Sequence, residues 1–72
     1  MKISYYPETD SLYIDLGTSP SHESREISPG VVVDYDAAGN VTGIDIDKAS
    51  HKLDLSELIL SKLPVTSQRM TA

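Results

Sequence analysis

Two stretches of the chain alternate between apolar and polar residues with a period of two, and a short polar turn interrupts each of them. The first stretch covers residues 2–16 and the second covers residues 31–46. Successive side chains of a β-strand point to opposite faces of a sheet, so a period of two predicts strands with one apolar and one polar face. Each stretch therefore predicts a β-hairpin, and this pattern constrains the fold more than any other feature.

The first hairpin is expected to turn at residues 7–10, where a proline and polar residues favour a four-residue loop. Pairing Tyr6 with Ser11 across that loop sets the register. The same register satisfies an apolar face and an opposite-charge pair, which supports it. The predicted pairs are Lys2 with Asp15, Ile3 with Ile14, Ser4 with Tyr13, and Tyr5 with Leu12.

The second hairpin is expected to turn at residues 37–40, with Asp36 opposite Val41. Gly43 then falls opposite Asp34, where a missing side chain lets another group approach the backbone or eases the twist. Ile14 of the first hairpin and Val33 of the second are predicted core residues. The other predicted pairs are Val31 with Ile46, Val33 with Ile44, and Tyr35 with Thr42.

Two further elements complete the predicted fold. Residues 23–27 form a weaker strand candidate that suits a sheet edge. Asp54 and Glu57 have the spacing of a capping box, Pro64 is a helix stop, and an apolar stripe lies between them. The prediction is an α+β domain over residues 1–63, an antiparallel sheet with one C-terminal helix packed on one face, and a flexible tail over 64–72. The stripe consists of Leu55, Leu58, Ile59 and Leu63.

Length and charge restrict the function. A chain of 72 residues buries only about 60% of its unfolded surface, and without cysteine it has no disulfide to reinforce a thin core. Dimerisation is the natural alternative. The net charge of −5 argues against nucleic acid, because an acidic surface repels phosphate. No apolar run suits a signal peptide or a membrane span, so a cytoplasmic protein is expected.

The sequence also resembles a known family, and the likeness covers roughly residues 2–50. The residues that carry it are Tyr6-Pro7-Glu8, Asp10, Leu12-Tyr13-Ile14, Leu16, Gly30-Val31, Asp34, Asp36, Gly39, Gly43-Ile44-Asp45-Ile46 and Ala49-Ser50. They are similar to the YuzE-like group of small prokaryotic proteins, a domain of unknown function. The resemblance implies a bacterial-type α+β domain and no particular activity.

Acidic residues near the second turn have part of the spacing of a calcium loop. Asp34, Asp36 and Asp45 match three ligand positions of such a loop, but Ala38 stands where another oxygen is needed. The flanks alternate like strands, and no helix enters the loop. We therefore predict no metal site, no catalytic residue and no cofactor. A small metal-dependent enzyme that uses these three carboxylates is kept as an alternative.

The two histidines carry little functional signal. His22 precedes Glu23 and Ser24, but neighbours in an extended chain point to opposite sides, so these letters are not a triad. His51 lies just before the predicted helix. We expect both imidazoles to be solvent-exposed.

The stronger candidates are apolar side chains left outside the predicted core. Tyr13, Val32 and Leu60 are predicted to contact a protein partner, because exposed apolar patches mark interaction surfaces. The leading hypothesis is a non-enzymatic module that forms a homodimer or binds another small protein. An acidic inhibitor of a basic toxin-like partner is a further alternative, suggested by the net charge.

Overall fold

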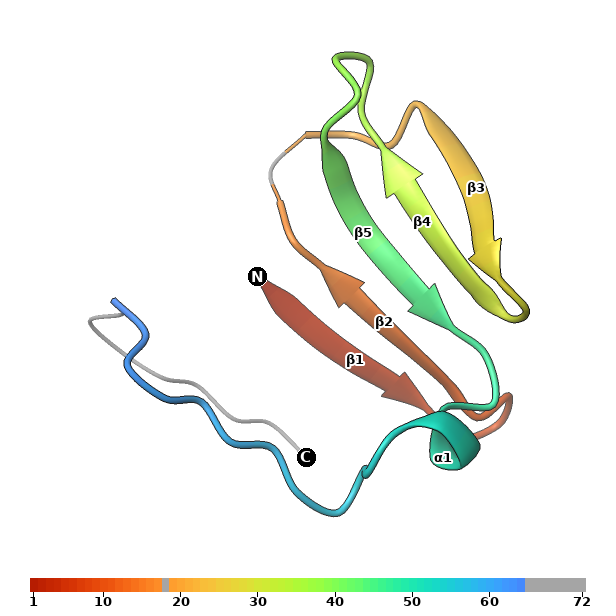
Figure 1. Cartoon of the computed structure of the whole chain (residues 1–72), viewed down its shortest axis with the longest axis vertical. Coiled ribbons are helices and arrows are strands. Elements are labelled where there is room, and N and C mark those ends of the chain that lie inside the picture. Colours follow the sequence, from red (N-terminus) through yellow and green to blue (C-terminus); the bar gives the residue numbers. More distant parts are fainter. Residues whose placement is uncertain (18, 65–72) are drawn as a thin grey trace.

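The first hairpin forms as predicted. The computed structural model describes residues 1–17 and 19–64, beginning with strands β1 (Lys2–Tyr6) and β2 (Ser11–Asp15) (Figure 1). All five predicted pairs are present, from Lys2 opposite Asp15 to Tyr6 opposite Ser11. The alternation of the sequence therefore determines the register, because a slip of one residue would move every apolar side chain to the other face.

The second hairpin, β4 (Val31–Tyr35) and β5 (Val41–Ile46), has the predicted register over most of its length. Near the turn the prediction is wrong, since Tyr35 lies opposite Val41 and not opposite Thr42. The turn is one residue tighter than expected, because the Asp36 amide donates to the Asn40 carbonyl at 2.8 Å. Strand β5 therefore has one residue more than β4 near the turn, and this residue, Thr42, forms a β-bulge. Gly39, at φ 88°, supplies the left-handed residue that such a turn requires.

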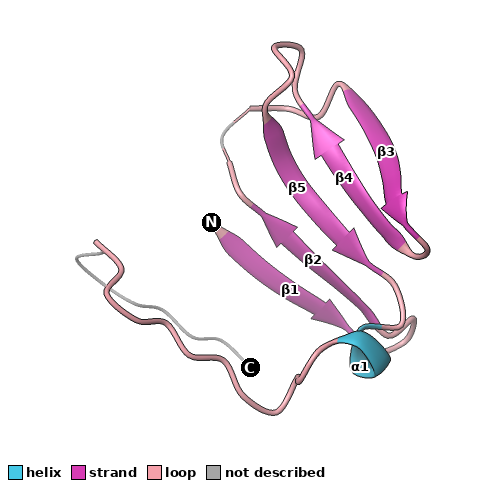
Figure 2. Cartoon of the chain, in the orientation of Figure 1, coloured by secondary structure: helices cyan, strands magenta, loops and turns pink. Residues whose placement is uncertain are grey.

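The weaker strand candidate is confirmed as an edge strand. Strand β3 (Glu23–Ser28) pairs with β4, and a bulge between Glu26 and Ser28 interrupts the pairing. The sheet has five strands in the order β1-β2-β5-β4-β3, and every neighbouring pair is antiparallel. The fold class predicted from the sequence is therefore confirmed, with β1 and β3 at the two edges (Figure 2).

The single C-terminal helix is confirmed, but its predicted position is wrong. Helix α1 (Ala49–Lys52) has four residues, and Leu53 is already extended at φ −128° and ψ 153°. The helix expected over residues 55–63 is absent, and Asp54 instead accepts a hydrogen bond from the Ser56 amide at 3.0 Å. An isolated helix of about nine residues is marginal in water, so it is stable only when its stripe is packed against a surface. In the structure all four residues of the stripe are exposed.

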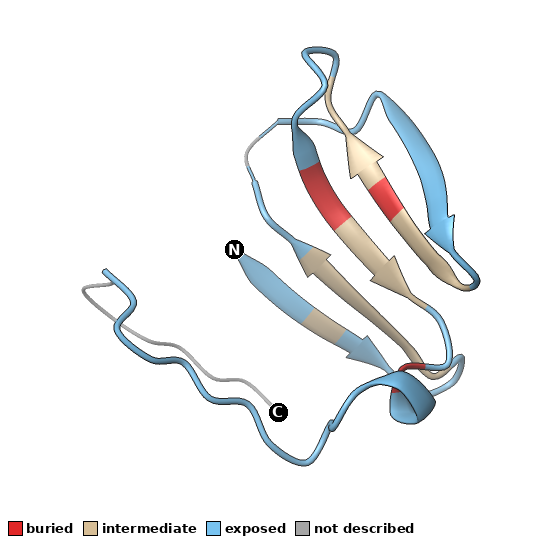
Figure 3. Ribbon diagram, in the orientation of Figure 1, coloured by how far each residue is buried: buried red, intermediate tan, exposed pale blue. Residues whose placement is uncertain are grey.

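The register gives the sheet two chemically different faces. The principal contacts between elements join neighbouring strands, so within the described residues neither α1 nor another strand layer covers the sheet. Val33 is a buried core residue as predicted, whereas Ile14 is half-buried (Figure 3). Among the described residues no helix is long and apolar enough to cross a membrane. The apolar face consists of Ile3, Tyr5, Leu12, Ile14, Val31, Val33, Ile44 and Ile46.

The single domain over residues 1–63 stays a prediction. Of the tail expected over 64–72, residues 65–72 lie outside the described residues.

Candidate functional site

The polar face of the sheet carries a hydrogen-bonded group that spans four strands. The Tyr13 hydroxyl, on β2, donates to Asp34 Oδ2 on β4 at 2.8 Å, and the Ser24 hydroxyl on β3 donates to Asp34 Oδ1 at 2.6 Å. Between β2 and β4 lies β5, and the Tyr13 ring passes over Gly43 there. A Cβ at Gly43 would collide with the Tyr13 hydroxyl and lie 2.7 Å from its Cζ. The expectation that Gly43 allows a close approach is confirmed, and the approaching group is Tyr13.

In this arrangement the Tyr13 hydroxyl acts as a hydrogen-bond donor to Asp34. The hydrogen bond to Asp34, reinforced by burial and by the charge of Asp34, raises the pKa of Tyr13 to about 12. The phenol therefore stays protonated at neutral pH and is unsuited to act as a base. Both oxygens of Asp34 are also occupied by hydroxyl donors.

Asp45 stands between the two sheet residues that were predicted to contact a partner. It lies opposite Tyr13 on one side and opposite Val32 on the other. Burial raises the pKa of the Asp45 carboxyl, and the charges of Asp47 and Asp34 raise it further. Tyr13 and Val32 are therefore on one face, as expected, but a carboxylate separates them. Leu60 is 45% exposed. Contact of Tyr13, Val32 and Leu60 with a partner stays a prediction.

The structure does not assemble the calcium-like motif. The Asp36 carboxylate accepts hydrogen bonds from the Asn40 and Ala38 amides, both at 2.9 Å, and closes the turn. These bonds, that from Asn40 first, lower the pKa of Asp36. Asp34 and Asp45 lie on the polar face, where each has different neighbours. Across residues 1–17 and 19–64, no group of three or more His, Asp or Glu side chains is placed to hold a metal ion.

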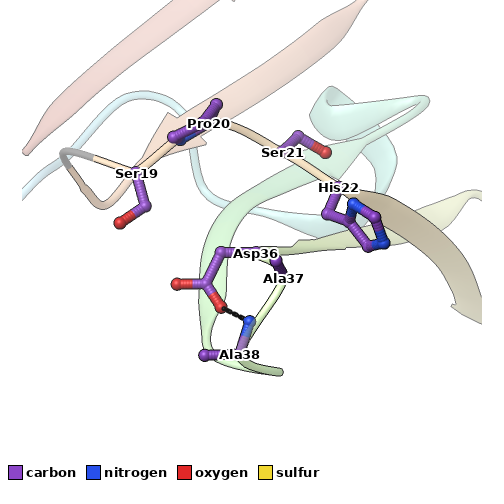
Figure 4. Close-up of a pocket in the computed structure, with 7 residues that line it drawn as sticks. All are labelled: Ser19, Pro20, Ser21, His22, Asp36, Ala37 and Ala38. Atoms are coloured by element: carbon purple, nitrogen blue, oxygen red, sulfur yellow. Dashed lines mark hydrogen bonds between the residues drawn. The ribbon is translucent and has the colours of Figure 1, made fainter.

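A shallow cleft lies between the turn of the second hairpin and the chain that enters β3 (Figure 4). His22 is at its rim, with its amide donating to the Tyr35 carbonyl at 2.7 Å. Asp36 uses its carboxylate within the turn, and Glu23 is paired with Arg25 at 2.8 Å. His22, Glu23 and Ser24 therefore do not form a catalytic triad. The cleft is lined by Ser19, Pro20, Ser21, His22, Asp36, Ala37 and Ala38.

A second cluster, which the sequence reasoning missed, attaches α1 to the first turn. Asp10 accepts hydrogen bonds from the Tyr5 hydroxyl at 2.8 Å and the Ser50 hydroxyl at 2.6 Å. The Ser50 amide donates to the same carboxylate at 3.1 Å, and the Ala49 amide donates to the Asp10 carbonyl at 2.8 Å. The bonds from Ser50 and Tyr5 lower the pKa of Asp10. We call Asp10, Tyr5, Ala49 and Ser50 the Asp10 cluster.

The fold and these clusters define a small α+β protein built on a single antiparallel sheet. Residues 2–50 match the model of a family described as a protein of unknown function, DUF2283, and the protein belongs to this family. The match ends at Ser50, a member of the Asp10 cluster. Comparison with curated proteins found no match, and neither did comparison with solved structures.

The contacts explain why particular residues carried the family resemblance. Asp10 and Ala49-Ser50 hold α1 to the first turn, while Asp34 and Gly43 receive the side chain of Tyr13. These positions serve the fold. The pattern therefore identifies an architecture.

Proposed function

We propose that this protein is a non-enzymatic interaction module that forms a homodimer through the apolar face of its sheet. The observation that carries the proposal is the exposure of that face. Ile3 and Tyr5 are each 42% exposed, and no apolar residue of the face other than Val33 is buried. An apolar surface of this kind, continuous across four strands, is typical of a protein interface.

The architecture supports the same conclusion. Stable domains are built from at least two packed layers, and the described part of this chain provides one. A second copy would supply the missing layer.

A second candidate function involves the polar face. Asp15, Glu26, Asp34 and Asp45 point to this side, and burial, followed by the charges of Asp47 and Asp34, raises the pKa of Asp45. A basic protein would be attracted to it, as the inhibitor hypothesis requires. Co-purification with a basic partner would support that function. We also keep the YuzE-like resemblance, a prokaryotic source and a cytoplasmic location as proposals, the last because the chain lacks cysteine.

The dimer is tested by light scattering together with thermal melts at several protein concentrations. We expect a dimeric mass and a melting temperature that rises with concentration. Ile3→Asp places a charge on the apolar face and should shift the mass to that of a monomer. Ser4→Asp is the matched control, since it adds the same charge to the opposite face of the same strand. A monomeric mass at high micromolar concentration, with a concentration-independent melt, would refute the dimer.

The same assay tests the three predicted contact residues. Val32 is half-buried on the polar face between Asp45 and Glu26, so the stability of the Val32→Asp monomer is measured beside its mass. If Val32→Asp or Leu60→Asp dissociates the dimer, that residue belongs to an interface. If neither does so while Ile3→Asp does, the interface is confined to the apolar face.

A further inference from the structure

We propose that the layer missing from the apolar face is the C-terminal segment, residues 53–64, of a second copy, folded as a helix and exchanged reciprocally. This inference rests on the proposed homodimer and names what forms its interface. The segment is unusually apolar for a solvated stretch of chain. Its predicted stripe is exposed in the structure: Leu55 is 41% exposed, Leu58 63%, Ile59 72% and Leu63 40%.

The sequence of this segment is typical of an amphipathic helix, but the segment is not helical in the structure. Asp54 and Glu57 have capping-box spacing, and the stripe recurs at intervals of three and four residues. A helix of about nine residues does not hold together alone in water. Packing the stripe on an apolar surface would provide the missing stabilisation, so docking and helix formation are expected to occur together.

The exit of the chain from α1 favours a second copy over the segment's own sheet. The Asp10 cluster holds the start of α1, and Lys52 at its end donates to the Asp47 carbonyl at 2.6 Å. From there the extended Leu53 leads the segment beyond β1, the edge strand, rather than back over the sheet (Figure 1). A segment projecting from an edge can reach a neighbouring molecule without disturbing either anchor.

The dimensions of helix and face agree. A nine-residue helix is about 13 Å long, and strands are about 4.8 Å apart, so the helix would cross about three strands. At the β3 side the apolar surface is closed, because the Arg25 guanidinium lies 5.5 Å from the centre of the Tyr35 ring. Beyond that pair the apolar surface extends over β1, β2, β5 and the Val31 end of β4. Reciprocal exchange would bury both faces and both stripes around one two-fold axis.

Cysteine cross-linking tests the exchange directly, because the chain has no cysteine and each introduced thiol is unique. Copies with Ile59→Cys are mixed with mass-tagged copies that carry Ile3→Cys, Ile14→Cys or Ile46→Cys, and are then oxidised. We expect a mixed disulfide in at least one pairing, since bridged residues need Cα atoms within about 7 Å. Ser4→Cys, on the opposite face of β1, is the control that should give none.

A charge on the stripe provides an independent measurement. Leu58→Asp should weaken the dimer at least about tenfold, because a charge would enter an apolar interface. Ser61→Asp adds the same charge outside the stripe, on the side of the expected helix away from Ile59 and Leu63, and should change the dissociation constant much less. Equal effects of the two variants would contradict the exchange.

The outcomes separate this inference from the proposed function. A dimer that forms no disulfide between segment and apolar face overturns the exchange and leaves dimerisation intact. A monomer in which Ile14→Cys and Ile59→Cys, combined in one chain, form an internal disulfide overturns both, since the segment then covers its own sheet. A monomer with no disulfide also overturns both.

Discussion

On the polar face of the sheet, Tyr13 and Ser24 reach from separate strands to the two oxygens of Asp34, whereas on the apolar face Ile3 remains 42% exposed. Both faces belong to the same five strands and follow from the same alternation of residues. The difference arises because a hydrogen bond needs one partner, which a neighbouring strand can supply. Apolar surface needs an opposing surface to exclude water, and one sheet cannot supply that for itself.

The two faces can be compared at two adjacent valines, Val32 and Val33, where we expect the largest effect on stability. Val33→Ala should destabilise the fold by roughly 2 kcal/mol or more, because Val33 is 6% exposed and the loss of its side chain leaves a cavity. Val32→Ala, one residue earlier on the polar face, should cost under about 1 kcal/mol. Urea denaturation monitored by circular dichroism measures both. Equal losses would show that the two faces are equally covered.

The second prediction concerns the crossing of Tyr13 over β5. Gly43→Ala should cost about 1.5–3 kcal/mol, because the new Cβ displaces the Tyr13 ring and breaks its hydrogen bond to the charged Asp34. In a Tyr13→Ala background the ring is already absent, and Gly43→Ala should then cost much less. A double-mutant cycle measures this coupling. If the cost of Gly43→Ala is the same in both backgrounds, the Tyr13 ring is not what requires a glycine.

The sequence predicts the strands and the registers of both hairpins, because each slip of register would reverse the faces. It does not predict the bulge at Thr42, since the tighter turn depends on Asp36 hydrogen-bonding within the loop. The Asp10 cluster is missed for another reason. Asp10 is an ordinary turn residue by type, and its partner Ser50 lies forty residues further along the chain.

The C-terminal helix shows a different limit of sequence reasoning. The stripe and capping box over residues 54–63 describe a helix that forms only against a surface, so pattern alone cannot decide whether it is folded in one chain. The four-residue α1 has no such pattern and forms because Asp10 binds its first residues. For the candidate site, the sequence predicted that a group could approach the backbone at Gly43. It did not predict that this group is the Tyr13 ring.

The third prediction uses two carboxyl groups whose pKa values shift in opposite directions. The pKa of Asp45 is raised by burial and nearby charges, so its charged form destabilises the fold at neutral pH, and this penalty is relieved as pH falls through the raised pKa. Asp45→Asn should therefore raise the melting temperature at pH 7. The gain should shrink as the pH falls towards about 4.

Asp36 is the matched case of opposite sign. Its pKa is lowered by the Asn40 and Ala38 amides, so its contribution is stabilising above the unfolded pKa of about 3.9 and is lost as pH falls through the folded value. Asp36→Asn should lower the melting temperature at pH 7, with a deficit that closes only in stronger acid. Thermal melts between pH 2 and 8 measure both variants. Shifts of the same sign at pH 7 would contradict the assignment.

The smallest effect is expected at the bulge, where Thr42 is 7% exposed and its hydroxyl has no hydrogen-bond partner among the described residues. An unsatisfied buried hydroxyl is unfavourable, and Thr42→Val replaces it with a methyl group of similar shape. The Thr42 carbonyl still accepts from the Leu16 amide at 2.9 Å, so the backbone is unaffected. We expect the free energy of unfolding, measured by denaturation, to rise by about 0.5–1 kcal/mol.

Thr42→Ser, which keeps the hydroxyl and loses the methyl, is the control and should destabilise the fold. A loss of stability in Thr42→Val would instead mean that the hydroxyl has a partner in solution. If that loss appears only at concentrations where the dimer forms, the partner belongs to the second copy.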